Sequence, residues 1–350
     1  MIMKIILHSS NNNKVIDEYL TFNQIPFEKI DLYDSSLDTY GRYNLTNLLE
    51  VNDPILLIIC LSTFNDICSW KQSKNQLINF CNRSNKLWIW NDADGTINLI
   101  NSTQCIDSNA VTWFLDAPLV NNNFNNIKFE LFPNSYFLSQ SVISRIKGAA
   151  VEKQNCQKQF LLTTIKKSGR EHRDYLWKEL ISRPSLLAQG HAVYKTPEKP
   201  WIGNTPHQTT WRDGYPSMDL YLDAWVEVVP ETMYKDAWFI TEKTVKPIMT
   251  KTPFLLLSTP GYLNYLKEKG FQTFDSLIDE SYNQQDNIED QAKMLVDQLE
   301  SIVNNGAEEF YHACADILEH NQQRLFEIGG GWHFHMDCFI HKKLQELGIN

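Results

Sequence analysis

Residues 238–282 read WFITEKTVKPIMTKTPFLLLSTPGYLNYLKEKGFQTFDSLIDESY, and they decide the fold of the second half of the chain. Thr241-Glu242-Lys243 follows an aromatic run and opens a predicted helix, in which Thr241 is the N-cap and Glu242 lies in the first turn. The apolar run 253–258 predicts a buried strand, and Pro260-Gly261 predicts a turn before a second helix. Helix and strand alternate here as they do around a parallel sheet.

Short apolar runs predict further strands at residues 2–7, 54–61, 87–90, 127–132, 160–164 and 224–229. Helical patterns follow at residues 14–20, 135–147, 170–181, 287–304 and 307–328. This alternation in both halves predicts an α/β fold of two Rossmann-like parallel-sheet domains with C-terminal helices. Residues 151–159 are polar and lack periodicity, so they are the predicted linker. The expected domains are 1–150 and 158–350.

Composition excludes several classes of protein. The net charge of −10 argues against broad nucleic-acid binding, which needs clustered Lys and Arg. The seven cysteines are scattered without a CxxC pair, which indicates reduced thiols and a cytoplasmic protein. The first residues, MIMKIILHSSNNN, hold too short an apolar run for a signal peptide. No apolar run approaches the ~20 residues of a membrane helix, so no membrane span is expected.

A basic turn follows the strand at 160–164, within the sequence FLLTTIKKSGREHR of residues 160–173. Cations at the carboxyl end of a parallel strand lie where open α/β sheets bind ligands. Arginine suits a diphosphate because its planar guanidinium donates two hydrogen bonds at once. Arg170, Arg173 and Lys243 are therefore candidate phosphate ligands. The alternative is that Thr241 to Lys243 only cap a surface helix and that the basic turn is only solvated.

Two segments suggest a metal, and each has a plainer interpretation. Asp92-Ala93-Asp94-Gly95 follows a predicted strand, and paired carboxylates suit a divalent cation. Asp94-Gly95 is also a hairpin-turn signal, and this interpretation is favoured. The segment 332–338, WHFHMDC, follows three glycines and has no second ligand pair at zinc spacing elsewhere. It is interpreted as a flexible joint followed by packing aromatics. The long loop with His207, Arg212 and Asp213 receives no role.

The order VEVVPET (226–232), FITEKTVKPI (239–248) and PFLLLSTPGYL (253–263) resembles the donor-binding half of the alpha-1,3-fucosyltransferase-like glycosyltransferases. The basic element after FLLTT is similar to one at the start of that domain, and the likeness covers residues 158–283. Related phage and viral glycosyltransferase-like proteins share the pattern. The resemblance implies a GT-B-like architecture that binds a nucleotide-sugar donor in the cleft between its domains, without an obligatory metal or other cofactor.

By this resemblance Glu242 binds the donor ribose, and Lys243 with Arg173 binds the diphosphate. Glu231 corresponds to an upstream acid of the family, and Gly261 to its glycine turn. The chain departs from the family at 251–254, Lys-Thr-Pro-Phe, and at Thr232, where the family has Asn, so the resemblance does not specify fucose.

The resulting hypothesis is a glycosyltransferase whose acceptor and catalytic base are open. An inverting reaction needs a carboxylate base, and the candidates at predicted strand ends are Asp92, Asp94 and Asp116. A second hypothesis is a non-catalytic nucleotide-binding protein that retains the fold. A third is metal-dependent transfer through Asp92 and Asp94.

Overall fold

The structure is a computed structural model of the 350-residue chain. It describes residues 3–8, 14–30, 32–34, 42–43, 45–51, 53–60, 67, 71–83, 85–90, 111–115, 128–131, 153–165, 170–194, 202–203, 218–235, 237–238, 240–330 and 332–349.

The chain forms two compact units. One comprises Met1–Pro133 with His333–Asn350, and the other comprises Asn134–Trp332. Each unit contains its own largely parallel sheet with helices, so the predicted α/β fold of two Rossmann-like domains is confirmed. The division differs from the expected boundaries at its end, because nearly all of helix α15 (Trp332–Glu346) lies in the first unit.

The sheet of the first unit has the order β2-β1-β5-β6-β7-β8, and all its described neighbours pair in parallel. Its strands are β1 (Lys4–His8), β2 (Phe27–Ile30), β5 (Ile55–Cys60), β6 (Lys86–Trp90), β7 (Val111–Leu115) and β8 (Lys128–Leu131). Residues 55–59 of β5 are 0% exposed, as expected for a strand covered on both faces. The strands predicted at 2–7, 54–61, 87–90 and 127–132 are confirmed. Strand β7 was not predicted.

Helices and a small hairpin complete the described part of this unit. The helices are α1 (Lys14–Phe22), α2 (Thr46–Leu49), α4 (Lys71–Cys81) and α15. The short strands β3 (Tyr33–Asp34) and β4 (Arg42–Tyr43) pair antiparallel. Ile340 and Leu344 of α15 are each 1% exposed, so this helix contributes to the packed interior.

The sheet of the second unit has the order β11-β10-β9-β12-β13. Its strands are β9 (Lys158–Ile165), β10 (Gly190–Tyr194), β11 (Ile202–Gly203), β12 (Ala224–Pro230) and β13 (Phe254–Leu257). The edge strand β11 is antiparallel to β10, and the other pairs are parallel. Every residue of β12 is buried, as in a central strand covered on both faces. The strands predicted at 160–164, 224–229 and 253–258 are confirmed.

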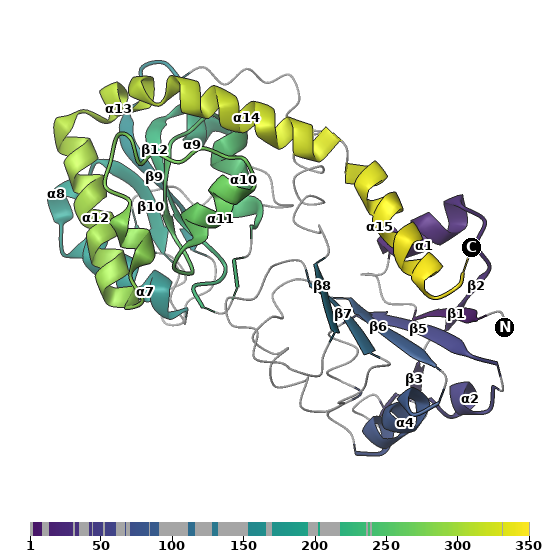
Figure 1. The fold of residues 1–350 in the computed structure, drawn as a ribbon. Helices are drawn as coiled ribbons and strands as arrows, with labels where there is room; N and C mark the ends of the chain where they lie inside the picture. The colour runs from purple at the N-terminus through teal and green to yellow at the C-terminus, as the bar shows by residue number, and fades with distance from the viewer. Residues whose placement is uncertain are drawn as a thin grey trace. The chain divides into compact units, whose positions relative to one another are not determined.

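Helices of the second unit pack against this sheet (Figure 1). They are α7 (Glu171–Ile181), α8 (Pro184–Leu187), α9 (Met218–Leu222), α10 (Glu242–Met249), α11 (Tyr262–Glu268), the 3₁₀ turn η3 (Ser281–Gln284), α12 (Ile288–Asn305), α13 (Ala307–Ala313) and α14 (Ala315–Gly330). The apolar face predicted for α12 is buried, with Leu295 and Leu299 at 0% exposure. The single helix predicted at 307–328 is wrong in one respect, because the chain breaks at Cys314 into α13 and α14.

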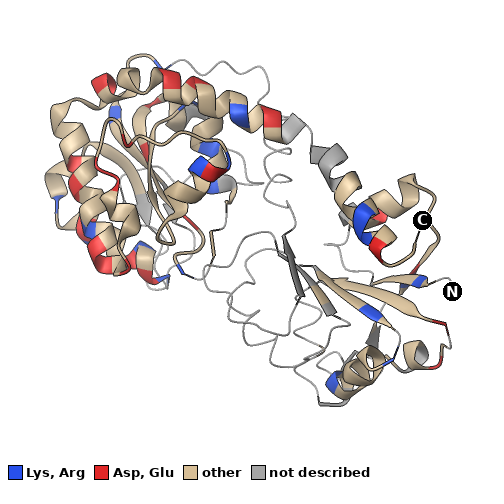
Figure 2. Ribbon diagram, in the orientation of Figure 1, with Lys and Arg blue, Asp and Glu red and all other residues tan. Residues whose placement is uncertain are grey.

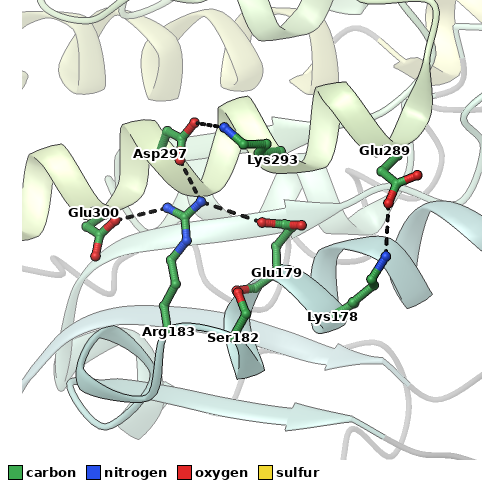
Figure 3. Close-up of polar contacts among 8 residues, drawn as sticks. All are labelled: Lys178, Glu179, Ser182, Arg183, Glu289, Lys293, Asp297 and Glu300. Carbon is green, nitrogen blue, oxygen red and sulfur yellow. Dashed lines mark hydrogen bonds and ion pairs between the residues drawn. The ribbon is translucent and has the colours of Figure 1, made fainter.

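Ion pairs connect α7 and the start of α8 to α12 (Figure 3). The guanidinium of Arg183, at the start of α8, lies 2.5 Å from a carboxylate oxygen of Asp297 and 3.0 Å from one of Glu300. Lys178 of α7 lies 2.9 Å from Glu289 of α12. Exposed pairs contribute about 1 kcal/mol or less each, so their main effect is to orient α7, whose first turn carries candidate site residues.

The three glycines of the predicted flexible joint, residues 329–331, lie where α14 ends and α15 begins, and the joint stays a prediction. Helix α14 runs through Gly330 and α15 begins at Trp332, so the backbone on both sides of Gly331 is helical. Glycine lowers helix propensity without forbidding a helix, and the flanking sequence outweighs it here. The predicted helix 135–147 and the hairpin turn at Asp94-Gly95 lie outside the described residues. Within those residues, no helix is long and apolar enough to cross a membrane.

Candidate functional site

The second sheet changes its winding direction between β9 and β12. From β9 the chain passes to β10 on one side, and it later returns to β12 on the other side. Open α/β sheets bind ligands outside the carboxyl ends of the strands at such a switch point. Helix α7 begins shortly after β9, and Glu231 directly follows β12. The topology therefore brings Arg170, Arg173 and Glu231 to one edge of the sheet.

Three consecutive carbonyls at the end of β12, those of residues 230–232, accept hydrogen bonds from the N-terminal end of α7. The Pro230 and Glu231 carbonyls accept from Nη2 of Arg173, at 3.4 and 3.1 Å. The Glu231 carbonyl also lies 2.8 Å from Nε2 of His172. The Thr232 carbonyl accepts from Nη1 of Arg170. Arg173 is 4% exposed, so this arginine is a buried residue, whereas Lys166 and Lys167 of the basic turn lie outside the described residues.

His172 is a neutral histidine between these cations. Its ring is 0% exposed and lies 4.7 Å from the ring of Tyr234, centroid to centroid. Burial, with smaller contributions from the charges of neighbouring arginines and Lys243, lowers the pKa of His172 to about 3. Since a carbonyl only accepts, Nε2 carries the proton and Nδ1 is unprotonated. Among the described residues, Nδ1 has no hydrogen-bond partner.

The side chain of Glu231 is 0% exposed and points into the protein. Its carboxylate accepts from the backbone N–H groups of Thr232 at 2.6 Å and Thr241 at 3.0 Å. The hydroxyl of Thr241 lies 2.8 and 2.7 Å from the two carboxylate oxygens, and the hydroxyl of Thr244 donates at 2.9 Å. A buried carboxylate with this many donors is well satisfied, and it joins the end of β12 to the start of α10.

Thr241 is the N-cap of α10, as predicted. Its hydroxyl oxygen accepts a 3.2 Å hydrogen bond from the backbone N–H of Lys243. The ammonium of Lys243 donates to the hydroxyl of Thr232 at 2.9 Å. Lys243 and Arg170 therefore both bind Thr232, one through its side chain and the other through its carbonyl. The candidate cations from α7 and α10 meet there.

Gly261 follows β13 with φ of +79°, the left-handed conformation that glycine adopts without strain. Its N–H donates to the Asn283 carbonyl at 2.8 Å, and the next helix begins with Tyr262. The hydroxyl of Tyr262 lies 3.3 Å from that of Thr244, so the turn after β13 connects to the carboxylate cluster of Glu231. The predicted glycine turn is confirmed, and it lies near the same edge of the sheet.

Other candidate residues are placed only in part or not at all. Glu242 begins α10, but its side chain is outside the described residues. Asp92, Asp94 and Asp116 are also outside them, as are residues 166–169 and 204–217. Within the described part of the chain, no group of three or more His, Cys, Asp or Glu side chains is arranged to hold a metal ion.

The sequence did not single out three residues that complete the site. Thr232 binds both Lys243 and Arg170, His172 packs between the cations, and Thr244 donates to Glu231. Thr241 and Thr244 are spaced i, i+3 at a helix start and so share a face. That spacing was a usable signal for Thr244. Thr232 was noted in the sequence only as a departure from the family's Asn, and nothing distinguished His172.

No family model matches this chain, and no curated protein matches it. Among solved structures, apo OtsA is similar with a TM-score of 0.43 and 10% identity, over 97% of this chain and 99% of that chain. An alpha,alpha-trehalose-phosphate synthase (UDP-forming) from Burkholderia vietnamiensis has a TM-score of 0.44 and 10% identity, over 98% and 99%. WaaG, a glycosyltransferase involved in lipopolysaccharide biosynthesis, has a TM-score of 0.32 and 11% identity, over 93% and 100%.

Proposed function

We propose that this chain is a glycosyltransferase that binds a nucleotide-sugar donor at the carboxyl ends of β9 and β12 and moves the sugar to an acceptor. The observation that carries the proposal is the meeting of Arg170 and Lys243 on Thr232, with the buried Arg173 beside them. These side chains come from two different helices. They converge at a topological switch point, the usual ligand position in such sheets.

A diphosphate matches the charge and geometry of this cluster. Arginine offers paired N–H donors to phosphate oxygens, and the ammonium of Lys243 adds a compact charge. The start of α10 contributes the positive end of a helix dipole. Acidic residues lie on several helices of this unit, including α12 and α13, as Figure 2 shows, and Glu171 and Asp174 are in the first turn of α7 itself. The match to an anion therefore rests on the cluster of Arg170, Arg173 and Lys243.

The proposed chemistry follows from these charges. When the bond between sugar and diphosphate breaks, negative charge develops on the leaving diphosphate. Lys243 and Arg170 stabilise it electrostatically, so the transfer proceeds without an obligatory metal. Glu242, in the first helical turn of α10, is proposed to bind the donor ribose, as the resemblance to the fucosyltransferase-like family implies. The base, the sugar and the acceptor stay open, and Asp92, Asp94 and Asp116 remain candidate bases.

The test is a thermal-shift screen against UDP-, GDP-, CMP- and dTDP-sugars, followed by calorimetry on the best donor. A ligand at 100 times its dissociation constant stabilises the folded protein by about 2.7 kcal/mol. We expect Lys243→Ala to weaken nucleoside diphosphate binding at least roughly tenfold, because it removes a charge-assisted contact. Lys178→Ala is the matched control. It removes one exposed lysine charge from the same unit, where Lys178 pairs with Glu289 of α12.

Equal affinities of the wild type and Lys243→Ala would contradict the proposed site. Binding without any hydrolysis of the donor sugar would instead favour the non-catalytic nucleotide-binding alternative. Loss of transfer on addition of a chelator, reproduced by Asp94→Asn, would favour metal-dependent transfer through Asp92 and Asp94.

A further inference from the structure

We propose that Glu231 is a positioning residue for the donor diphosphate and does not touch the donor. Its carboxylate fixes the start of α10 and the conformation of Thr232, and through them it fixes Lys243 and Arg170. This inference rests on the proposed function, and it gives a role to Glu231, which the sequence resemblance identified only as an upstream acid.

The carboxylate of Glu231 is buried and its oxygens already accept hydrogen bonds, and both facts exclude direct contact with the donor. The residue is 0% exposed, and donors from Thr232, Thr241 and Thr244 surround both carboxylate oxygens. A ribose hydroxyl would have to displace one of these donors and open the packed end of β12. Arg173 and His172 contact Glu231 at its backbone carbonyl.

The first connection runs from Glu231 to Lys243 through the helix cap. The hydroxyl of Thr241 donates its proton to the carboxylate, so its lone pairs are left for the N–H of Lys243. A hydroxyl has only one proton to donate. Because the Thr241 hydroxyl donates it to the carboxylate, the carboxylate fixes the orientation of this capping hydroxyl. Without the negative charge, the Thr241 hydroxyl can rotate and the first turn of α10 loses its fixed start.

The second connection runs through Thr232. The carboxylate of Glu231 holds the Thr232 N–H at 2.6 Å, which sets the backbone conformation of that residue. The hydroxyl of Thr232 then receives Lys243 at 2.9 Å, and its carbonyl receives Arg170. Both cations proposed to bind the diphosphate are thus oriented by one residue whose backbone Glu231 holds.

Glu231→Gln tests this role with little change in size. A carboxamide keeps one acceptor oxygen but replaces the other with an NH₂ group, a donor. That donor would face the N–H and hydroxyl donors that now surround the carboxylate, so part of the network must break. We expect the affinity for a diphosphate to fall roughly tenfold to a hundredfold, as for the loss of a charge-assisted hydrogen bond.

Glu227→Gln is the matched control. Glu227 lies on β12, the strand that Glu231 directly follows. It is also 0% exposed, and its carboxylate accepts a 3.0 Å hydrogen bond from the hydroxyl of Tyr221. The control therefore removes a buried carboxylate from β12 without touching Thr232 or α10. It separates a loss of general stability from a loss of positioning.

The experiment measures the binding of inorganic pyrophosphate, UDP and GDP by calorimetry for wild type, Lys243→Ala and both glutamine variants. Hydrogen exchange of the peptides that contain Thr232, Thr241 and Lys243 is measured in the same samples. The inference expects Glu231→Gln to weaken binding and to speed exchange at these amides, while Glu227→Gln keeps wild-type affinity and exchange there. Melting temperatures of the two variants provide the stability comparison.

Two outcomes overturn the inference in different ways. If wild type binds a probe, Lys243→Ala loses it and Glu231→Gln retains wild-type affinity, the positioning role is wrong and the proposed function stands. If wild type binds none of these probes, the proposed function fails and the inference fails with it. Equal weakening by both glutamine variants also refutes positioning, because the effect then follows from a buried carboxylate anywhere on β12.

Discussion

Lowering the pH from 7 to 5 is expected to destabilise the second unit through His172. The imidazole is fully buried, its Nδ1 has no partner among the described residues, and Arg170, Arg173 and Lys243 oppose a further positive charge. Its pKa is lowered to about 3 in the folded protein, against about 6.5 in the unfolded chain. Below pH 6.5 the imidazole is mostly protonated in the unfolded chain, whereas it stays neutral in the folded protein. Stability is therefore lost as the pH falls.

The size of the effect follows from this pKa difference. At pH 5 the histidine is protonated in the unfolded chain and neutral in the folded protein. Because pH 5 lies about 1.5 pH units below the unfolded pKa, and each unit corresponds to about 1.36 kcal/mol, the free energy of unfolding is lowered by about 2 kcal/mol. The corresponding cost at pH 7 is about 0.2 kcal/mol. We therefore expect His172 alone to lower the free energy of unfolding by about 2 kcal/mol between pH 7 and pH 5.

The assay is hydrogen exchange of peptides from β9 and β12, which reports the opening of the second unit without assuming that both units unfold together. His172→Gln is the test variant, because its amide N–H reaches as far as Nε2 but does not titrate. His312→Gln is the control, since His312 has a side chain that is 64% exposed. A pH dependence in His172→Gln as steep as in wild type would refute the reasoning.

Two further predictions concern the same unit. Lys153 is 3% exposed and donates to the Ala224 carbonyl, and burial lowers its pKa to about 7 from 10.5. Between these two pKa values the lysine is protonated in the unfolded chain and neutral in the folded protein, so the free energy of unfolding rises with pH, by about 2 kcal/mol from pH 7 to pH 9. This rise should be absent in Lys153→Met, as measured by denaturant titration. Gly261→Ala should lower the melting temperature through a strain of about 1 kcal/mol, because its φ is +79° while the added Cβ meets Trp238 only at an ordinary 3.7 Å. An unchanged melting temperature would contradict this.

The fold was largely predictable because its strands are continuous apolar runs bounded by polar turns. Residues 55–59 and 254–257 are buried, and their sequence indicates strands without tertiary information. Strand β7, Val111–Leu115, was missed although the turn-forming residues Asp107-Ser108-Asn109 stand just before its short apolar run. The domain membership of α15 was not readable, since an amphipathic helix does not show which core it joins.

The local structure around the candidate site was predicted better than the roles of its residues. The cap at Thr241 and the glycine turn at Gly261 follow from local rules and are present. The role of Glu231 was not predictable from sequence, because residues 231, 241 and 244 come together only when β12 and α10 pack. From sequence alone, an acid beside a candidate phosphate site is interpreted as a ligand. The burial of Glu231 instead favours the positioning role that we propose.

The electrostatics of the site follow from the kinds of atoms that hold its cations. The bonds described for Arg170 and Arg173 end on backbone carbonyls, which orient a guanidinium without adding a full negative charge. The carboxylate of Glu231 is directed at hydroxyl and amide donors of α10. The neighbouring His172 stays neutral chiefly because burial lowers its pKa, with a smaller contribution from those cations. An anion that reaches this edge of the sheet therefore meets preoriented positive charge in a chain whose net charge is −10. This is the arrangement that a departing diphosphate needs.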